Sequence, residues 1–537
     1  MSGVGKGVAT SSMGLILKQR GFEVNLVKID PYLNVDAGTM NPTEHGEVFV
    51  LKSGLETDQD MGNYERFLGR DLGVQDYMTS GMVYQTVIER ERALEYGGKC
   101  VEAVPHVRDE ILRRVEAAAS HNGSSVSVIE IGGTVGDFQN ALFIDAARVL
   151  KLKYPDDVIF VMVSYLPVPN TLGEMKTKPT QSAVRELNSY GVQPDFIIAR
   201  SNGAMDDKRK EKLAISCNVR PDRIISAPDV ESIYDVPLNL EKDHIGDLLM
   251  DALKMEKRTV EADLDEWRDF VEKTRAEGKP KLTIGIVGKY FDTGDFVLSD
   301  AYLSVIEAIK FSSAQAGVKS KIEWVNAKTI EKEGTACLER YDGIIVPGGF
   351  GETGIEGKIL TARYCRENGV PYFGLCYGLH MMVIEYARTM LGLKDAHTVE
   401  INASTPHPVI DVMPDQKQHI KEGKYGGTMR LGSYPANLRE GTIARDAYGA
   451  DSVEERHRHR YEVNPEYIPQ LEKEGLVFSG TSPDGVLMEI AELPKKIHPF
   501  YLGCQFHPEL QARPLAPHPL FTKFIEASYD RSLHAEG

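Results

Sequence analysis

Cysteine is scarce in this sequence, with six residues in a chain of 537. Their number and spacing are not typical of a disulfide framework or a zinc site, which leaves open only chemistry at a single cysteine. No stretch approaches the run of about 18 apolar residues that a membrane span requires. The first residues show no basic segment leading into an apolar one, as a secretory signal would. We therefore expect a cytoplasmic protein with no membrane partner.

Positive charge is also in short supply. The chain has 62 Lys and Arg residues against 79 Asp and Glu residues, which gives a net charge of −17. Such a surface repels nucleic acid, so we expect no nucleic-acid partner. A polyphosphate ligand would have to be bound by local clusters of cations and by backbone N–H groups.

Apolar, β-branched runs alternate with segments of helical periodicity along the whole chain. Examples are GFEVNLVKID, SSVSVIEIGG, DVIFVMVSYLP and PDFIIARSN, followed after a charged stretch by LTIGIVGKY, DGIIVPGG and PYFGLCYG. Continuous apolar strands of this kind are typical of parallel sheets covered on both faces. The pattern predicts an α/β protein with two doubly wound parallel-sheet domains, residues 1–252 and 282–537, joined by a helical linker at 253–281.

The second half contains one cysteine in a distinctive setting. In PYFGLCYGLH, Cys376 follows an apolar strand, precedes a helical run, and is flanked by Gly374 and Gly378. This is the sequence form of a nucleophile elbow, and a helix N-terminus favours the thiolate form of such a residue. From this stretch alone a buried structural cysteine is an equal alternative.

Two further segments supply the partners that a cysteine nucleophile needs. CQFHPEL follows another apolar strand and offers His507 as a base and Glu509 to orient it. In DGIIVPGGFG, the diglycine Gly348-Gly349 follows a strand and allows backbone N–H groups to approach a developing oxyanion, with the amide of Tyr377 as a second donor.

PGGFG, G-x-C-x-G and FHPE in this order resemble the class I glutamine amidotransferases. The resemblance implies that Cys376, His507 and Glu509 form a triad that releases ammonia from glutamine. It also implies a set of glutamine-binding positions: Gly349, Tyr377, Gly378, Leu379, His380, Glu400 and Arg460. His380 departs from the usual Gln, and we expect an altered glutamine affinity from it.

A complete phosphate-binding loop is missing at the start of the chain. MSGVGKGVATSSMG reads as G-x-x-x-x-G-K-[ST] only if the first glycine lies ahead of Met1, and Gly7 stands where a hydroxyl should be. From the residues alone, a phosphate loop and a chance glycine-rich start remain equal alternatives.

The segments KIDPYLNVDAGTMNPTEHGEVFVLKSGLETDQDMGNYERF, IEIGGTVGDFQN, KTKPTQ, GGTMRLG and ERHRHRYEVN together resemble the CTP synthase family. The resemblance implies ATP-dependent phosphorylation of UTP, displacement by ammonia to give CTP, and Mg²⁺ as metal. It further implies GTP as an activator acting near GGTMRLG, CTP as product and inhibitor, and a homotetramer, with filament formation left open.

The family pattern assigns roles to the following residues of the first half. ATP would contact Gly3, Val4, Gly5, Lys6, Gly7, Val8 and Lys28, and the metal would be held by Asp60 and Glu130. UTP and CTP would contact Ser2, Asp137, Phe138, Gln139, Lys176, Thr177, Lys178, Pro179, Thr180, Gln181 and Lys212.

Some features depart from the family and keep alternatives open. Gln139 replaces the usual acidic residue, which bears on how CTP is told from UTP. The family begins with a β-strand and T-G-G-x-x-S ahead of this start, so we expect either that Met1 is internal to a longer protein or that this form is impaired. The alternative functions are a nucleotide-binding scaffold or filament subunit and another glutamine-dependent amidoligase, such as GMP synthetase or a cobyric acid synthase relative.

Overall fold

A computed structural model describes residues 3–41, 45–169, 174–256, 262–288, 299–412 and 429–535. The chain divides into two compact units. One comprises Met1–Thr39 and Asp60–Val271, and the other comprises Met40–Gln59 and Glu272–Gly537. The segment 40–59 therefore folds with the C-terminal unit, although both of its ends continue into the N-terminal one.

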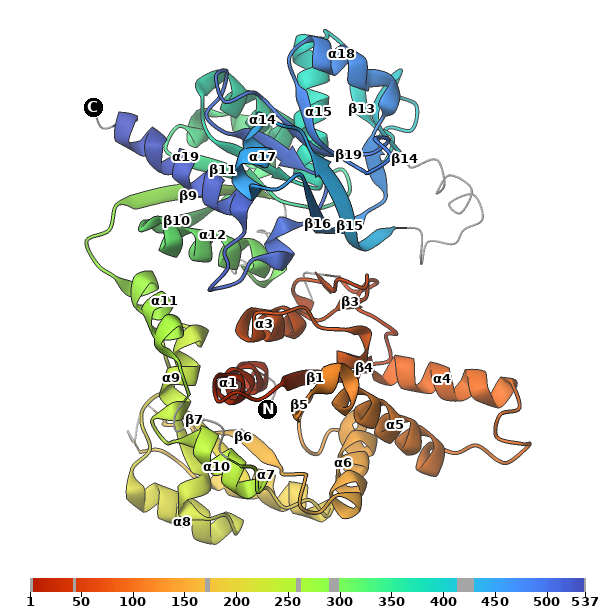
Figure 1. Cartoon of the computed structure of the whole chain (residues 1–537), viewed down its shortest axis with the longest axis vertical. Coiled ribbons are helices and arrows are strands. Elements are labelled where there is room, and N and C mark those ends of the chain that lie inside the picture. The colour runs from red at the N-terminus through yellow and green to blue at the C-terminus, as the bar shows by residue number, and fades with distance from the viewer. Residues whose placement is uncertain are drawn as a thin grey trace. The chain divides into compact units, whose positions relative to one another are not determined.

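The N-terminal unit alternates strands with helices, as the sequence predicts (Figure 1). Its strands are β1 (Val24–Asp30), β4 (Tyr77–Thr79), β5 (Val126–Ile131), β6 (Val161–Tyr165), β7 (Phe196–Ser201) and β8 (Ile224–Pro228). Its helices are α1 (Lys6–Gln19), α3 (Gln59–Leu68), α4 (Ser80–Arg92), α5 (Arg108–Ala119), α6 (Ala141–Lys153), α7 (Lys178–Ser189), α8 (Asp207–Cys217), α9 (Val236–Glu241), α10 (Ile245–Ala252) and α11 (Asp265–Arg275).

Helices cover both faces of the first sheet, whose order is β4-β1-β5 with all pairs parallel. Val27 and Ile29 of β1 pack with α4, α5 and α6 in one core. The neighbouring Leu26 points to the opposite face, where a Cβ on Gly14 of α1 would lie 2.7 Å from it. Alternate residues of one strand thus meet helices on opposite faces, which explains why β1 is apolar throughout.

The sheet of the N-terminal unit is interrupted, which the sequence did not predict. The strands β6, β7 and β8 form a second parallel sheet, and β5 and β6 are not hydrogen-bonded to each other. A cavity of about 350 Å³ lies between their facing edges, lined by Val128, Met162 and residues of α1. The predicted continuous sheet is therefore two three-stranded sheets with an apolar gap between them.

The strands of the C-terminal unit form one large sheet and two small ones, β13-β14-β17 and β2-β3. Its strands are β2 (Phe49–Val50), β3 (Glu56–Thr57), β9 (Lys281–Gly288), β10 (Lys319–Asn326), β11 (Gly343–Val346), β12 (Tyr372–Leu375), β13 (Ala396–Thr398), β14 (His407–Val412), β15 (Arg430–Leu438), β16 (Ser452–His459), β17 (Tyr461–Val463), β18 (Val477–Thr481), β19 (Met488–Glu492) and β20 (Tyr501–Cys504). Its helices are α12 (Leu303–Ala316), α13 (Ala327–Glu333), α14 (Ile355–Asn368), α15 (Tyr377–Met390), α17 (Ile443–Tyr448), α18 (Ile468–Lys473) and α19 (Pro519–Ala535).

Nine strands form the main sheet in the order β10-β9-β11-β12-β20-β19-β18-β15-β16. The strands from β10 to β20 are parallel, and the pairs from β20 to β16 are antiparallel. The predicted α/β class is confirmed, but the antiparallel half was not anticipated. Within it, β18, β19 and β20 follow one another with connections too short for a parallel crossover.

The helices of the C-terminal unit cover both faces of the parallel half. Tyr372 of β12 belongs to a core shared with α13, α14 and α15. Its neighbour Phe373 points the other way and stacks edge-on with Phe521 of α19, with ring centroids 5.0 Å apart. The helices α12 and α19 lie side by side on this second face (Figure 1).

The segment 40–59 contributes the small hairpin β2–β3 and binds along β15 and β16. Arg456 of β16 donates to the carbonyl of Val50 at 3.1 Å, and Arg458 pairs with Glu56 at 2.7 Å. The amide of Ser433 donates to the carbonyl of Lys52 at 2.9 Å. These contacts explain why a stretch located early in the sequence folds with the C-terminal unit.

Among the described residues, no helix combines the length and the apolar character needed to cross a membrane.

Candidate active sites

Cys376 occupies a strained turn between β12 and α15. Its φ and ψ are 49° and −97°, an unusual conformation for a residue other than glycine. The flanking glycines make the turn possible: a Cβ on Gly374 would lie 2.7 Å from the backbone of Gly378, and one on Gly378 would lie 2.1 Å from the carbonyl oxygen of Val346. The nucleophile elbow predicted from the sequence is therefore present as local geometry.

His507 and Glu509 follow β20, the strand next to β12. Nδ1 of His507 lies 2.7 Å from a carboxylate oxygen of Glu509. Burial alone would lower the pKa of His507, but the charges of Glu509 and Cys376 outweigh it and raise this pKa well above its usual value. Nδ1 of the imidazole thus faces a carboxylate, while Nε2 is buried with no hydrogen-bond partner among the described residues.

Backbone amides near Cys376 are accessible because glycines border the same space. A Cβ on Gly348 would lie 2.8 Å from Cε1 of His507, so this position has no room for a side chain. The hydroxyl of Tyr377 donates to the carbonyl of Gly351 at 3.0 Å, which ties the start of α15 to the glycine loop after β11. The arrangement places the loop predicted to hold an oxyanion beside the imidazole.

The residues predicted to bind glutamine lie around this elbow in different environments. Glu400 is half-buried and accepts from the amide of Gly351 at 3.0 Å, while Arg460 is half-buried directly after β16. His380, in the first turn of α15, is only 2% exposed, and its Nε2 lies 2.9 Å from Oε1 of Gln505. Burial lowers the pKa of His380 to about 4, so its ring is neutral.

A buried polar cluster lies on β15, β16, β17 and β19. Arg430 pairs with Glu489 at 2.8 Å and with Glu462 at 3.6 Å, and His457 bonds His459 at 2.8 Å. Burial raises the pKa of Glu489 to about 7, with Arg430 acting in the opposite direction. The sequence associates this segment with GTP, but residues 413–428 are outside the described part and Arg430 is only 8% exposed.

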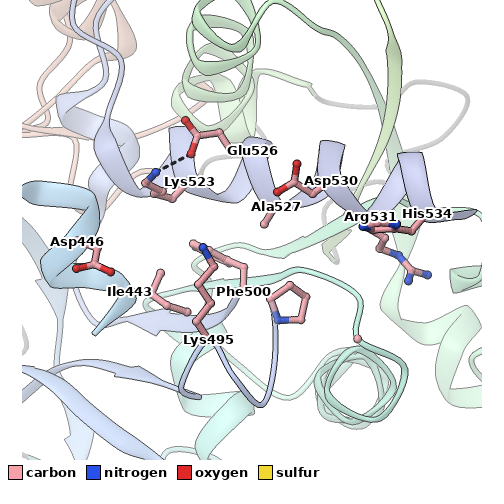
Figure 2. Close-up of a pocket in the computed structure, with 12 residues that line it drawn as sticks. Ile443, Asp446, Lys495, Phe500, Lys523, Glu526, Ala527, Asp530, Arg531 and His534 are labelled. Atoms are coloured by element: carbon pink, nitrogen blue, oxygen red, sulfur yellow. Dashed lines mark hydrogen bonds and ion pairs between the residues drawn. The ribbon is translucent and has the colours of Figure 1, made fainter. Parts of the chain in front are cut away.

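A cavity of about 500 Å³ elsewhere in the C-terminal unit contains none of the predicted catalytic groups. Lys495, Phe500 and the helix α19 line it, and Lys523 of that helix pairs with Glu526 at 2.7 Å (Figure 2). None of its lining residues is a cysteine or a residue other than glycine with a positive φ. The chemistry of this unit therefore belongs to the elbow at Cys376.

In the N-terminal unit, the predicted phosphate loop comes directly before α1. Gly3 and Gly5 have φ values of 72° and 83°, and a Cβ on Gly5 would lie 2.5 Å from the guanidinium of Arg200. Nζ of Lys6, the first residue of α1, donates to the carbonyl of Gly133 at 2.9 Å. Burial lowers the pKa of Lys6, although nearby carboxylates oppose this effect. Loop amides and a lysine thus meet at a helix N-terminus, a favourable place for phosphate.

Lys28, at the end of β1, gathers the predicted metal ligands around its amine. Nζ of Lys28 contacts Asp60 directly, lies 3.1 Å from Glu130 and lies 3.6 Å from Asp30. Burial raises the pKa of Glu130, with Lys28 opposing it. A Cβ on Gly7 would lie 2.4 Å from a carboxylate oxygen of Asp60, which brings the loop and these acids together.

Whether these acids fit a metal ion is decided by their number and chemistry. Among the described residues, no group of three or more His, Cys, Asp or Glu side chains has the geometry of a metal site. Asp60 and Glu130 nevertheless converge on one cation, and the three carboxylates around Lys28 exceed its single positive charge. Two hard oxygen ligands suit Mg²⁺, which keeps most of its waters or takes phosphate oxygens instead.

The KTKPTQ segment forms the start of α7. Thr180 and Gln181 are buried: the hydroxyl of Thr180 lies 2.8 Å from that of Ser164, and the amide of Gln181 donates to the hydroxyl of Thr177 at 3.1 Å. Lys178 and Pro179 are exposed, while Lys176 pairs with Glu174 at 2.7 Å. The buried residues hold the turn, and the exposed ones face solvent.

The remaining predicted nucleotide contacts lie on two other loops or are not described. Asp137 accepts from the amide of Thr134 at 3.0 Å, and Phe138 beside it is 93% exposed, as is expected for a residue that meets a ligand or another chain. Lys212 of α8 is exposed and, after Lys176 and Arg209, is among the cations that lower the pKa of Glu174. Ser2 lies outside the described residues.

Sequence reasoning did not find several residues in these two sites. Gln505 contacts both His380 and Cys376, and Tyr64 donates to Glu130. Asp30 could have been found, because it is two residues from Lys28 on the same face of β1. Arg200 meets the phosphate loop from β7 and carried no signal in the sequence.

Taken together, a cysteine elbow with a histidine–glutamate pair and a phosphate loop next to a lysine–carboxylate cluster define a glutamine-dependent ligase of the amidotransferase class. Residues 1–255 match the family described as CTP synthase N-terminus, and residues 297–527 match glutamine amidotransferase class-I.

Comparison with individual proteins gives the same result. A CTP synthase of Pyrococcus abyssi is 49% identical over 530 residues, 98% of this chain and 96% of the relative. One of Thermococcus gammatolerans is 48% identical over 533 residues, 99% of this chain and 97% of the relative. A structure of a Trypanosoma brucei CTPS glutaminase domain with bound acivicin is 32% identical, covering 46% of this chain and 94% of that one with a TM-score of 0.43. The chain belongs to the CTP synthase family.

Proposed function

We propose that this chain converts UTP to CTP with ATP, using ammonia that it releases from glutamine. The observation that carries the proposal is the strained Cys376 beside the His507–Glu509 pair, in a chain that belongs to the CTP synthase family over almost its full length. The residues before 253 would perform the synthetase chemistry, and those after 281 the glutaminase chemistry. The comparisons lend no support to a noncatalytic scaffold, to GMP synthetase or to a cobyric acid synthase relative.

In the glutaminase half, His507 takes the thiol proton of Cys376, and the sulfur attacks the carboxamide carbon of glutamine. Amides of the Gly348–Gly349 loop and of Tyr377 stabilise the oxyanion. His507 then gives its proton to the leaving nitrogen, ammonia departs, and a γ-glutamyl thioester remains. Water activated by His507 hydrolyses the thioester to glutamate and restores the thiol. Glu509 stabilises the imidazolium in both steps.

The α-groups of glutamine require complementary charges close to the elbow. Glu400 would bind the ammonium group and Arg460 the carboxylate. Support comes from Glu400, which is already fixed by the amide of Gly351 in the glycine loop that borders the nucleophile. Gly349, Tyr377, Gly378 and Leu379 would form the wall of the pocket.

In the synthetase half, the loop amides and Lys6 would bind the phosphates of ATP, and Lys28 would neutralise the phosphoryl group as it moves to O4 of UTP. Asp60 and Glu130 would hold Mg²⁺, which when bound neutralises phosphate charge. Ammonia then displaces the phosphate at C4 to give CTP. The lysines of the 176–181 loop and Lys212 would bind the triphosphate of UTP or of CTP, with Asp137 to Gln139 close by.

Two family properties extend the proposal. We propose a homotetramer, supported by Phe138, a large apolar side chain that is 93% exposed in the single chain beside the proposed nucleotide site. We also propose GTP as an activator of the glutaminase half.

The test is a direct assay of CTP formation. The protein is incubated with UTP, ATP and Mg²⁺, and with either glutamine or ammonium as the nitrogen source. We expect CTP with both sources. CTP with ammonium alone would refute the glutaminase assignment, and no CTP with either source would refute the synthetase assignment.

A further inference from the structure

We propose that Gln505 stabilises the thiolate of Cys376 by donating a hydrogen bond to its sulfur, and that His380 positions Gln505 for this task. The inference rests on the proposed glutaminase function and adds two residues to it. Nε2 of Gln505 lies 3.8 Å from Sγ of Cys376, and Oε1 of the same amide lies 2.9 Å from Nε2 of His380.

The contacts of the sulfur show why a donor matters there. A carbonyl oxygen, that of Arg458, lies 3.9 Å from Sγ. A carbonyl can accept from a thiol but repels a thiolate, whereas an amide N–H stabilises the thiolate. Gln505 is therefore a neutral donor that favours the charged form of Sγ in addition to the imidazole of His507.

Because Gln505 is buried, the orientation of its side-chain amide decides which of its atoms faces Sγ of Cys376. Gln505 is 0% exposed, so no solvent is available to replace a lost partner of either end of its amide. Its backbone is fixed as well, because its N–H donates to the carbonyl of Glu489 at 2.8 Å. Only rotation of the side-chain amide decides whether an N–H or an oxygen faces the sulfur.

His380 selects the productive orientation. A neutral imidazole has one N–H. Nε2 of His380 faces Oε1 of Gln505, and the carbonyl of Tyr461 is a second acceptor that acts on the same ring. The NH₂ group of Gln505 faces Cys376 and its oxygen faces His380, so in this orientation Nε2 of His380 carries the proton and donates to Oε1. Burial holds the pKa of His380 at about 4, so this neutral state persists across the working range of pH.

The same contact serves the second half of the reaction. When water hydrolyses the thioester, the C–S bond breaks and the electron pair returns to sulfur as a thiolate. A donor already aimed at that atom stabilises the leaving group. Loss of the donor should therefore slow both attack and release.

The experiment compares Gln505→Leu and Gln505→Glu with Gln470→Leu, a matched change on the exposed α18. A hydrogen bond to a charged group corresponds to roughly 10- to 100-fold in rate. We expect glutaminase kcat to fall by roughly 10- to 100-fold in both Gln505 variants. KM for glutamine should change by less than about threefold, since the amide does not bind substrate. We expect alkylation of Cys376 by iodoacetamide at pH 7 to slow in parallel.

Gln505→Glu keeps the shape of the side chain but buries a carboxyl group, so the melting temperature of each Gln505 variant is measured beside its rate to detect misfolding. His380→Gln, whose amide can still donate to Oε1, should lose less glutaminase kcat than His380→Phe, which should fall toward the Gln505 variants. Parent rates of turnover and alkylation in both Gln505 variants would overturn the proposal, as would equal losses in His380→Gln and His380→Phe. The proposed function itself fails separately, if alkylated Cys376 leaves glutaminase activity intact.

Discussion

The two sites of this chain differ in how complete they are before any ligand binds. At Cys376, the groups proposed as nucleophile, base, orienting carboxylate and oxyanion amides all belong to the chain, and the elbow and the His507–Glu509 contact are present in it. At Lys28, the groups that would handle phosphate and metal are paired with one another: the amine contacts Asp60 and Glu130.

The difference follows from the chemistry of each step. Attack on a carboxamide needs only protein groups in fixed geometry, so the site can be built in advance. Phosphoryl transfer needs charge neutralisation by a metal and by the nucleotide's own phosphates, which the chain cannot supply. Internal ion pairs hold such a site together until those charges arrive.

The largest effect on activity should come from a change at Cys376. Cys376→Ala removes the nucleophile, so we expect glutamine-dependent CTP formation to fall by about 10⁴-fold or more. Ammonium-dependent formation should change by less than about twofold, because that route bypasses the thioester. Both rates are measured on the same preparation. Loss of both would contradict the separation of the two sites.

Lys28→Met removes the cation that pairs with Asp60 and Glu130. Leaving buried carboxylates without their cation should lower the unfolding free energy by about 3–5 kcal/mol and abolish CTP formation from either nitrogen source. If the acids are metal ligands, millimolar Mg²⁺ should raise the melting temperature of the variant more than that of the parent. Equal responses to Mg²⁺, measured by thermal unfolding, would show that these carboxylates serve only Lys28.

Gly378→Ala tests how rigid the elbow is. Its Cβ would meet the carbonyl oxygen of Val346 at 2.1 Å, so the turn must shift. We expect a loss of about 2–4 kcal/mol in urea unfolding, together with a large fall in glutaminase kcat. Gly203→Ala is the control, because nothing lies within 4 Å of its added Cβ. A variant with parent stability and kcat would mean that the elbow can relax.

Glu489→Gln addresses the buried cluster of the C-terminal unit. Folding raises the pKa of Glu489 from its ordinary 4.5 to about 7, so the folded state holds this proton more tightly. This proton contributes to the unfolding free energy fully below pH 4.5. The contribution falls by on the order of 3 kcal/mol as pH rises through 7. The variant should lose this slope in melting temperatures measured from about pH 5 to pH 8. Parallel slopes in parent and variant would contradict it.

Local sequence predicted much of the fold because each strand has a strong apolar signal. The runs that contain β1, β5, β9 and β12 were recognised, since strands buried on both faces have few polar residues. The antiparallel half and the gap between β5 and β6 were not predicted, because periodicity says nothing about which strands pair. The placement of residues 40–59 with the C-terminal unit depends on contacts with β15 and β16, far away in the sequence.

In the candidate sites, too, the sequence predicted residues that follow strands but not contacts between distant side chains. Cys376, His507 and Glu509 were found because each directly follows a strand, and the carboxyl ends of neighbouring parallel strands meet at one edge of the sheet. Gln505 was overlooked although it lies in the same motif, because its role depends on where two other side chains point. His380 was predicted to meet glutamine, and its burial against Gln505 could not be read from the sequence.

The central claim is that one chain releases nitrogen at Cys376 and incorporates it into a pyrimidine nucleotide. The most direct measurement supplies glutamine labelled with ¹⁵N in its amide, together with UTP, ATP and Mg²⁺, and analyses the CTP by mass spectrometry. The account predicts CTP carrying ¹⁵N at its exocyclic nitrogen with the parent and none with Cys376→Ala. Hydrolysis of labelled glutamine without labelled CTP from the parent would contradict it.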